Sequence, residues 1–199
     1  MSIHAMQRLF FAVRPPDDVL DDVASLQWGL DPDRWIDFDQ LHITLRFLGE
    51  VHERVARTLH EGLGPLPLPP LPLQLQGVGH FPSKGRPRVL WVGLRDDTPA
   101  HRLRAALDRQ LAGLGLPSDG HRLHPHLTVA RLGVAGKRDG QVAEWLGARG
   151  LYRSRPFQVP SVVLYRSILR PEGAIYERVL TLRLAGEQAD AVGEGPQRG

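Results

Sequence analysis

Two kinds of apolar pattern alternate along the chain, and together they predict an α+β fold. Short apolar runs predict strands, whereas apolar residues that recur three or four positions apart predict helices. Val51, Val55, Leu59 and Leu63, for example, predict a helix over residues 51–63. The predicted strands cover residues 8–13, 34–37, 42–49, 73–80, 87–94, 126–133, 157–169 and 174–184. The predicted helices cover residues 17–30, 51–63, 99–115 and 139–149.

Proline and glycine divide this pattern. Residues 64–74 read GPLPLPPLPLQ, and their prolines exclude a helix, so an extended crossover is expected there. Residues 185–199 are polar and rich in glycine, which is typical of a disordered tail. A single folded domain is therefore predicted over residues 1–184.

One short sequence occurs twice. Residues 42–49 read HITLRFLG and residues 126–133 read HLTVARLG, and each lies on a predicted strand that a helix follows. A lone His-x-Thr on a strand is an ordinary polar face, but a repeat at comparable places in the fold is not explained by chance. The repeat predicts two similar lobes, each an antiparallel sheet with helices on its outside, and a cleft between the lobes.

Side chains alternate between the faces of a strand, so each repeat presents an imidazole and a hydroxyl together. His42 and Thr44 are expected on one face, about 7 Å apart along the strand, and His126 and Thr128 repeat this arrangement. The same alternation places Arg46 and Leu48 beside His42 and Thr44, and Ile43, Leu45 and Phe47 on an apolar face that packs against helices.

Arg131 follows the second repeat and could neutralise a bound phosphate. It lies five residues after His126, so strict alternation directs it to the wrong face. It reaches the cleft only if the strand ends or bulges near Ala130.

Two opposed imidazoles suit phosphodiester chemistry. The ordinary pKa of histidine, near 6.5, allows one ring to take a proton and the other to give one. Each such transfer contributes roughly 10²–10⁴-fold to the rate. Thr44 and Thr128 can hold the non-bridging phosphate oxygens, so this chemistry requires no metal and no cofactor.

Several segments together resemble the 2H phosphoesterase superfamily. These are RLFFAVRPP, HITLRFLG, FPSKGRPRVLWVGL, HPHLTVAR and LYRSILRPEGAIYERV, which span about residues 7–184. Within that superfamily the chain is most similar to the RNA 2′,3′-cyclic phosphodiesterases, also named 2′-5′ RNA ligases. The resemblance implies a LigT-like fold of two α+β lobes around a V-shaped cleft.

The resemblance also implies an activity, which is hydrolysis of a terminal RNA 2′,3′-cyclic phosphate to a 2′-phosphate. It makes His126 the general base, His42 the general acid, and Thr44, Thr128 and Arg131 the phosphate-binding residues. Ligation of a cyclic end to a 5′-hydroxyl through a 2′,5′ linkage is expected as a minor reverse reaction. The near symmetry of the two repeats cannot itself decide which histidine is the acid.

Composition limits the cellular location and the kinds of site that the protein can have. The net charge is +3 with a pI near 9.8, and 23 of the 25 basic residues are arginine. Arginine suits phosphate binding, but genome composition is the favoured explanation of this bias, so charge alone says little about nucleic acid. The absence of cysteine excludes disulfides and thiolate metal sites. No apolar run is long enough for a membrane helix or a signal peptide, so a cytoplasmic protein that does not bind membranes is expected. Nothing in the sequence suggests an obligate dimer, so a monomer is expected.

Other readings remain open. The cleft could bind RNA or a 2′,5′-oligonucleotide without hydrolysis, or act on a different small cyclic phosphate. His124 and His126 could chelate a metal, although no HExxH motif or carboxylate ligand accompanies them. Phe81 and Trp91 could stack on a nucleobase, and core packing is the competing interpretation.

Overall fold

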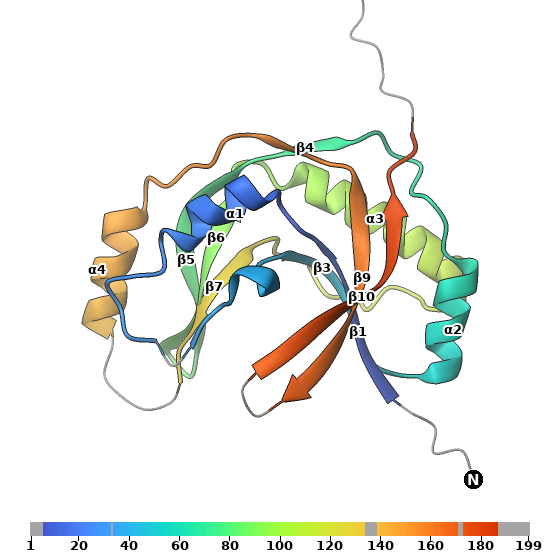
Figure 1. The fold of residues 1–199 in the computed structure, drawn as a ribbon, viewed down its shortest axis with the longest axis horizontal. Coiled ribbons are helices and arrows are strands. Elements are labelled where there is room, and N and C mark those ends of the chain that lie inside the picture. Colours follow the sequence, from blue (N-terminus) through green and yellow to red (C-terminus); the bar gives the residue numbers. More distant parts are fainter. Residues whose placement is uncertain (1–5, 33, 134–138, 171–172, 187–199) are drawn as a thin grey trace, which may run out of the picture.

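One antiparallel sheet passes through both halves of the molecule (Figure 1). The computed structural model describes residues 6–32, 34–133, 139–170 and 173–186. The strands are β1 (Met6–Val13), β2 (Arg34–Trp35), β3 (Ile43–His52), β4 (Leu71–Leu73), β5 (Leu75–Ser83), β6 (Arg86–Leu94), β7 (Leu127–Arg131), β8 (Phe157–Val159), β9 (Ser161–Arg170) and β10 (Gly173–Arg183). The helices are α1 (Asp17–Ala24), α2 (Glu53–Gly62), α3 (Thr98–Gly113) and α4 (Asp139–Arg149), with a 3₁₀ turn, η1 (Phe38–Gln40).

The sheet has two halves that meet at a single residue pair. Its strand order is β10-β9-β1-β3-β7-β6-β5, with β2 added beside β7. β3 and β7 are joined through the pairing of Ile43 with Leu127, and on either side of this pair the halves diverge (Figure 1). The prediction of an α+β fold with two antiparallel lobes is confirmed.

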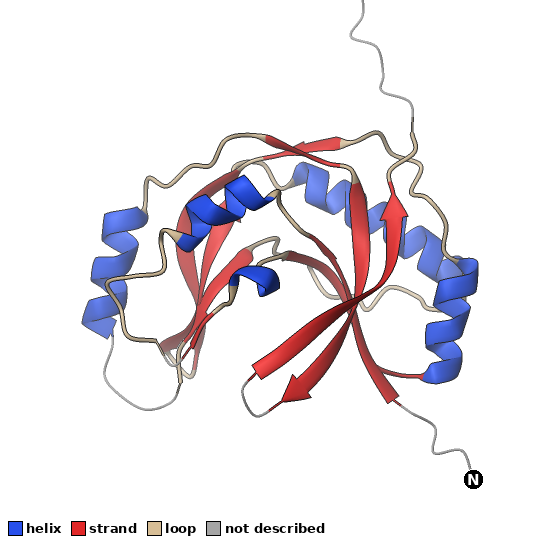
Figure 2. Cartoon of the chain, in the orientation of Figure 1, coloured by secondary structure: helices blue, strands red, loops and turns tan. Residues whose placement is uncertain are grey.

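Helices cover the outer side of each half (Figure 2). α2 and α3 pack against β3, and α4 packs against β5 and β6. Leu103, Leu107 and Leu111 of α3 are fully buried in the main core, where each contributes about 1.5–3 kcal/mol relative to an exposed side chain. The inner faces of the strands are thereby left to form the walls of a cleft.

The predicted first helix is shorter than expected. α1 ends at Ala24, whereas the sequence pattern predicts a helix to residue 30. The Nε2 atom of Gln27 donates hydrogen bonds to the carbonyls of Ile36 and Val129, and Gly29 adopts a φ of 73°. Tertiary contacts therefore draw this segment away from the helix axis.

The proline-rich segment is extended, as predicted. Leu66 forms a bridge with Leu184, and β4 pairs with β8 in a separate two-stranded sheet. At the start of the predicted tail, the amide groups of Ala185 and Gly186 donate hydrogen bonds to the carbonyls of Leu66 and Leu68. The rest of that prediction, residues 187–199, lies outside the described residues.

A β-bulge in β7 explains how the side chain of Arg131 reaches the cleft. Trp91 of β6 pairs with Thr128, but the preceding residue, Leu90, pairs with Ala130, so Val129 is an extra residue. Val129 and Ala130 are both buried, and the alternation of faces is reversed beyond them. Arg131 consequently lies on the same face as Thr128.

β3 carries the equivalent bulge, and it corrects part of the sequence prediction. Ala12 pairs with Thr44 and Phe11 with Arg46, so Leu45 is the extra residue. Arg46 is therefore buried instead of lining the cleft, and Phe47, expected on the buried face, is 57% exposed. The alternation of apolar and polar positions in the repeat contains no sign of the extra residue.

The buried Arg46 lies in a group of four charged side chains. Its Nη1 atom is 2.9 Å from Asp108 Oδ1, and its Nε atom is 3.5 Å from Asp119 Oδ2. Arg104 bridges the same two carboxylates and donates a hydrogen bond to the carbonyl of Leu45. This group fastens α3, and the segment that leads toward His126, to the bulge directly after Thr44.

Candidate active site

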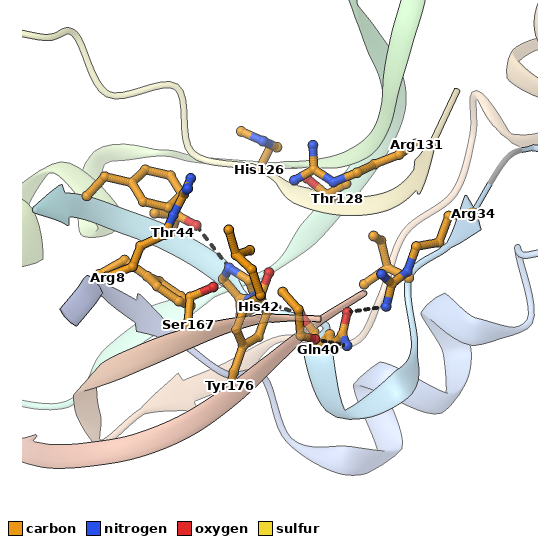
Figure 3. Close-up of a pocket in the computed structure, with 15 residues that line it drawn as sticks. Arg8, Arg34, Gln40, His42, Thr44, His126, Thr128, Arg131, Ser167 and Tyr176 are labelled. Atoms are coloured by element: carbon orange, nitrogen blue, oxygen red, sulfur yellow. Dashed lines mark hydrogen bonds between the residues drawn. The ribbon is translucent and has the colours of Figure 1, made fainter. Parts of the chain in front are cut away.

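A cleft of about 400 Å³ lies where the two halves of the sheet meet. Its walls come from both halves, and Figure 3 shows the two histidines on opposite sides of it. All five residues predicted for catalysis and phosphate binding line this cleft: His42, Thr44, His126, Thr128 and Arg131.

The two imidazoles are oriented in the same way. The Nδ1 atom of His42 is 2.6 Å from the carbonyl oxygen of Gln40, and that of His126 is 2.6 Å from the carbonyl oxygen of His124. A carbonyl oxygen only accepts, so each Nδ1 carries the hydrogen and donates. Each Nε2 is then free to accept or transfer a proton, which is the arrangement that acid–base catalysis requires.

Thr44 contacts the reactive nitrogen of His42 directly. Its Oγ1 atom lies 3.0 Å from His42 Nε2, and in the neutral ring this nitrogen accepts the hydroxyl hydrogen (Figure 3). A hydroxyl in this place can turn to donate to a phosphate oxygen when the ring is protonated.

Aromatic side chains hold both rings from behind. Phe10 packs against His42 with a centroid distance of 5.0 Å, and Tyr176 meets it edge-on at 5.3 Å. Phe81 meets His126 edge-on at 4.7 Å, and Trp91 lies 6.4 Å from it. Rigid apolar support fixes the two ring positions and removes water from around them.

This burial lowers both pKa values. Desolvation lowers the pKa of His42 to about 4, and the positive charges of His126 and Arg131 add to the effect, against the opposing hydrogen bond to Gln40. Desolvation also lowers the pKa of His126, with smaller contributions from Arg131 and His124. Both imidazoles are therefore neutral near pH 7 in the empty cleft.

A polar chain behind His42 was missed by the sequence prediction. The Oε1 atom of Gln40 accepts a hydrogen bond of 3.1 Å from Arg34, and its Nε2 atom donates to the carbonyl of Ala174 over 2.6 Å. Arg34 also pairs with Asp37 at 3.0 Å. The side chain of Gln40 thus joins β10 while its carbonyl orients His42, a role that its position two residues before His42 could have suggested.

Arg8, Ser167 and Tyr176 also line the cleft and were likewise not predicted as site residues. All three belong to segments that carry the family resemblance. No charge or motif pattern in those segments indicated that their side chains would reach the histidines.

Phe81 and Trp91 line a second hollow of about 610 Å³ that shares His126 with the cleft. The indole of Trp91 lies across Gly79, where an added Cβ atom would come within 2.3 Å of the ring. Base stacking by these residues remains a prediction, and in this structure both rings lie beside the imidazole of His126.

A metal site at His124 and His126 is the alternative that the sequence leaves open. Among the residues that the structure describes, no group of three or more His, Cys, Asp or Glu side chains is placed to hold a metal ion. In the same part of the chain, no helix is long and apolar enough to cross a membrane.

Comparisons of sequence and of structure with known proteins point to the same family. A sequence profile of the 2′-5′ RNA ligase superfamily matches residues 15–168. A protein of Aeropyrum pernix named RNA 2′,3′-cyclic phosphodiesterase is 34% identical over 156 residues, which cover 77% of this chain and 88% of that protein. The crystal structure of TT0787 from Thermus thermophilus has a TM-score of 0.70 at 28% identity and covers 91% of this chain and 100% of its own. E. coli LigT complexed with 3′-AMP has a TM-score of 0.68 at 26% identity, with coverages of 90% and 98%.

Proposed function

The chain belongs to the 2′-5′ RNA ligase superfamily, and we propose that it is an RNA 2′,3′-cyclic phosphodiesterase that works with two histidines. The substrate is an RNA or a small nucleotide that ends in a 2′,3′-cyclic phosphate, and the product is the 2′-phosphomonoester. Ligation of such an end to a 5′-hydroxyl is the minor reverse reaction.

One observation carries this proposal. Two imidazoles enter one cleft from opposite halves of the sheet, and each has its Nδ1–H held by a backbone carbonyl. A hydrolysis that needs a base on one side of a phosphorus atom and an acid on the other is served directly by this pair.

In the proposed mechanism, His126 Nε2 takes a proton from water while the water oxygen bonds to phosphorus. The bond from phosphorus to the 3′ oxygen breaks, and protonated His42 gives its Nε2 proton to that oxygen. His126 ends protonated and His42 neutral, so proton exchange with solvent restores the starting state.

Binding of the phosphate anion favours the protonated state of His42 that the mechanism requires. In the empty cleft both rings are neutral, whereas a bound phosphate anion favours the protonated form of a nearby imidazole. Thr44, Thr128 and Arg131 donate to the non-bridging oxygens and stabilise the charge that develops on them. Substrate binding thereby charges the acid.

The proposal also covers the domain organisation, the oligomeric state and the location of the protein. Residues 1–184 would form one bilobal domain that acts as a monomer in the cytoplasm, since each half supplies part of the same site and the cleft is complete within one chain. Size-exclusion chromatography with light scattering would test the monomer, and a dimer mass would contradict it.

The test is hydrolysis of a nucleoside 2′,3′-cyclic phosphate in the presence of EDTA, with identification of the product isomer. His42→Ala and His126→Ala should each lose at least about 10²-fold in kcat/KM, and the wild type should release the 2′-phosphate. His101→Ala, which changes an exposed histidine of α3, is the matched control. Full activity in either cleft variant would overturn the mechanism. Binding of the substrate without turnover by the wild type would favour a binding protein.

A further inference from the structure

The cleft continues beyond the two histidines onto a row of polar side chains. Arg8 of β1 pairs with Ser167 of β9, and Ser167 pairs with Tyr176 of β10. Residues directly opposite one another on antiparallel strands point to the same face. All three side chains accordingly line the cleft with His42, and Figure 3 shows Arg8 on the other side of His42 from Arg131.

This row of Arg8, Ser167 and Tyr176 lies close to His42. Phe10, whose ring packs on His42 at 5.0 Å, is two residues from Arg8 on the same face of β1. Two residues along a strand span about 7 Å. A group that binds Arg8 would therefore be adjacent to the reacting phosphate without touching it.

Arg8 offers an unused positive charge. Within the described part of the chain it has no ion pair or side-chain hydrogen bond, although Glu50 is its register partner on β3. On the opposite face of the β9–β10 hairpin, by contrast, Arg166 is paired with Glu177. An arginine with free donors at a cleft that handles phosphate is suited to a second phosphate.

The other half of the sheet lacks this feature. Phe10 pairs with Phe47 two residues beyond the bulge of β3, and Val89 pairs with Arg131 at the equivalent distance beyond the bulge of β7. Val89 is thus the counterpart of Phe10, and Pro87, two residues before it, is the counterpart of Arg8. Of these two equivalent positions only that of Arg8 carries a charge, and this asymmetry would give a bound chain a direction.

We infer that Arg8, with the hydroxyls of Ser167 and Tyr176, binds the phosphate on the 5′ side of the terminal nucleotide. The inference rests on the proposed function. A cyclic phosphate occupies the 2′ and 3′ oxygens, so the RNA chain leaves through the 5′ oxygen, and the next phosphate is one sugar away. The row would make the enzyme prefer an RNA end to a lone nucleoside cyclic phosphate.

The experiment compares two substrates that differ in one group, adenosine 2′,3′-cyclic phosphate with a 5′-hydroxyl and with a 5′-phosphate. The wild type should favour the 5′-phosphorylated substrate by about 10-fold in kcat/KM, as a charge-assisted hydrogen bond supplies. Arg8→Ala should reduce this ratio to about 1, and Arg8→Lys should retain part of it. Arg183→Ala, an exposed arginine at the far end of β10, should keep the wild-type ratio. A wild-type ratio near 1, or a ratio unchanged by Arg8→Ala, would overturn the inference.

A binding measurement separates this inference from the proposed function. Calorimetry would compare adenosine 2′-phosphate with adenosine 2′,5′-bisphosphate on the wild type and on Arg8→Ala. A preference for the bisphosphate that disappears in Arg8→Ala supports the subsite even if no substrate is hydrolysed, in which case the proposed function fails by itself. Equal binding of the two ligands by the wild type rejects the subsite while leaving the hydrolysis result to stand.

Discussion

Ile43 and Leu127 pair with each other where β3 meets β7, and each is the middle residue of a His-x-Thr sequence. Because the two strands are antiparallel, the motifs run in opposite directions through this pair. The two motifs therefore meet head to tail about a local two-fold axis. A single backbone pairing therefore brings together two motifs that are 84 positions apart in the sequence.

The pH dependence of catalysis should differ between kcat/KM and kcat. kcat/KM reports the free enzyme, in which burial lowers the pKa of His42 to about 4 and also lowers that of His126. Its bell-shaped profile should have its maximum below pH 6.5 and fall toward higher pH. The bound phosphate raises both pKa values, so kcat should peak at a higher pH. Profiles of initial rates between pH 4 and 9 check this, and a flat kcat/KM from pH 5 to 9 would contradict the two-histidine mechanism.

The roles of acid and base can be assigned with an altered leaving group. A thiolate leaves without protonation, so a substrate with sulfur in place of the 3′ oxygen needs no general acid. His42→Ala should hydrolyse this substrate within about 10-fold of the wild-type rate, while His126→Ala remains at least about 10²-fold slower. Single-turnover rates on the two substrates measure the difference. Rescue of His126→Ala instead of His42→Ala would exchange the two roles.

Arg131 should be sensitive even to replacement by lysine. The bulge at Val129 directs the guanidinium into the cleft, where its two-pronged geometry fits a phosphate. We expect Arg131→Lys to lose about 10-fold and Arg131→Ala about 10²-fold in kcat/KM, consistent with one or two charge-assisted hydrogen bonds. Arg109→Ala, exposed on α3, provides the control. Arg131→Ala with wild-type activity would remove this residue from the mechanism.

Burial of His42 should also make stability depend on pH. Its pKa is about 4 in the folded protein and about 6.5 in the unfolded chain, so the unfolded chain binds the proton first as the pH falls. The stabilisation is complete above pH 6.5 and is lost between pH 6.5 and 4, by about 3 kcal/mol. His42→Asn should lack this loss, whereas the exposed His101→Asn should show it. Urea unfolding at a series of pH values gives the free energies, and parallel curves for wild type and His42→Asn would refute the expectation.

The buried charges under Thr44 should contribute strongly to stability. Asp108 pairs with both Arg46, which is 5% exposed, and Arg104. Asp108→Ala leaves these cations poorly compensated, and we expect the free energy of unfolding to fall by about 3 kcal/mol. Asp97→Ala removes an exposed pair with His101 and should cost less than about 1 kcal/mol. Denaturant unfolding compares the two variants, and equal losses would show that the buried group is not a special source of stability.

The amino-acid sequence by itself determined where most of the elements lie and which residues are candidates for the chemistry. Apolar periodicity is a local property, so it predicted most strands and helices, and the repeated His-x-Thr indicated two lobes with one imidazole each. The five residues that it predicted for catalysis and phosphate binding all line the cleft. The family resemblance gave these residues their proposed roles.

Only the tertiary structure decided which faces the side chains occupy beyond the repeat. The extra residues Leu45 and Val129 reverse the alternation, because a bulge is defined by the partner strand and not by the bulged strand alone. Arg46 thereby enters the core, and Arg131 enters the cleft. Arg8 likewise joins the site because of strand register across β1, β9 and β10, which depends on contacts between residues far apart in the chain and which no local pattern records.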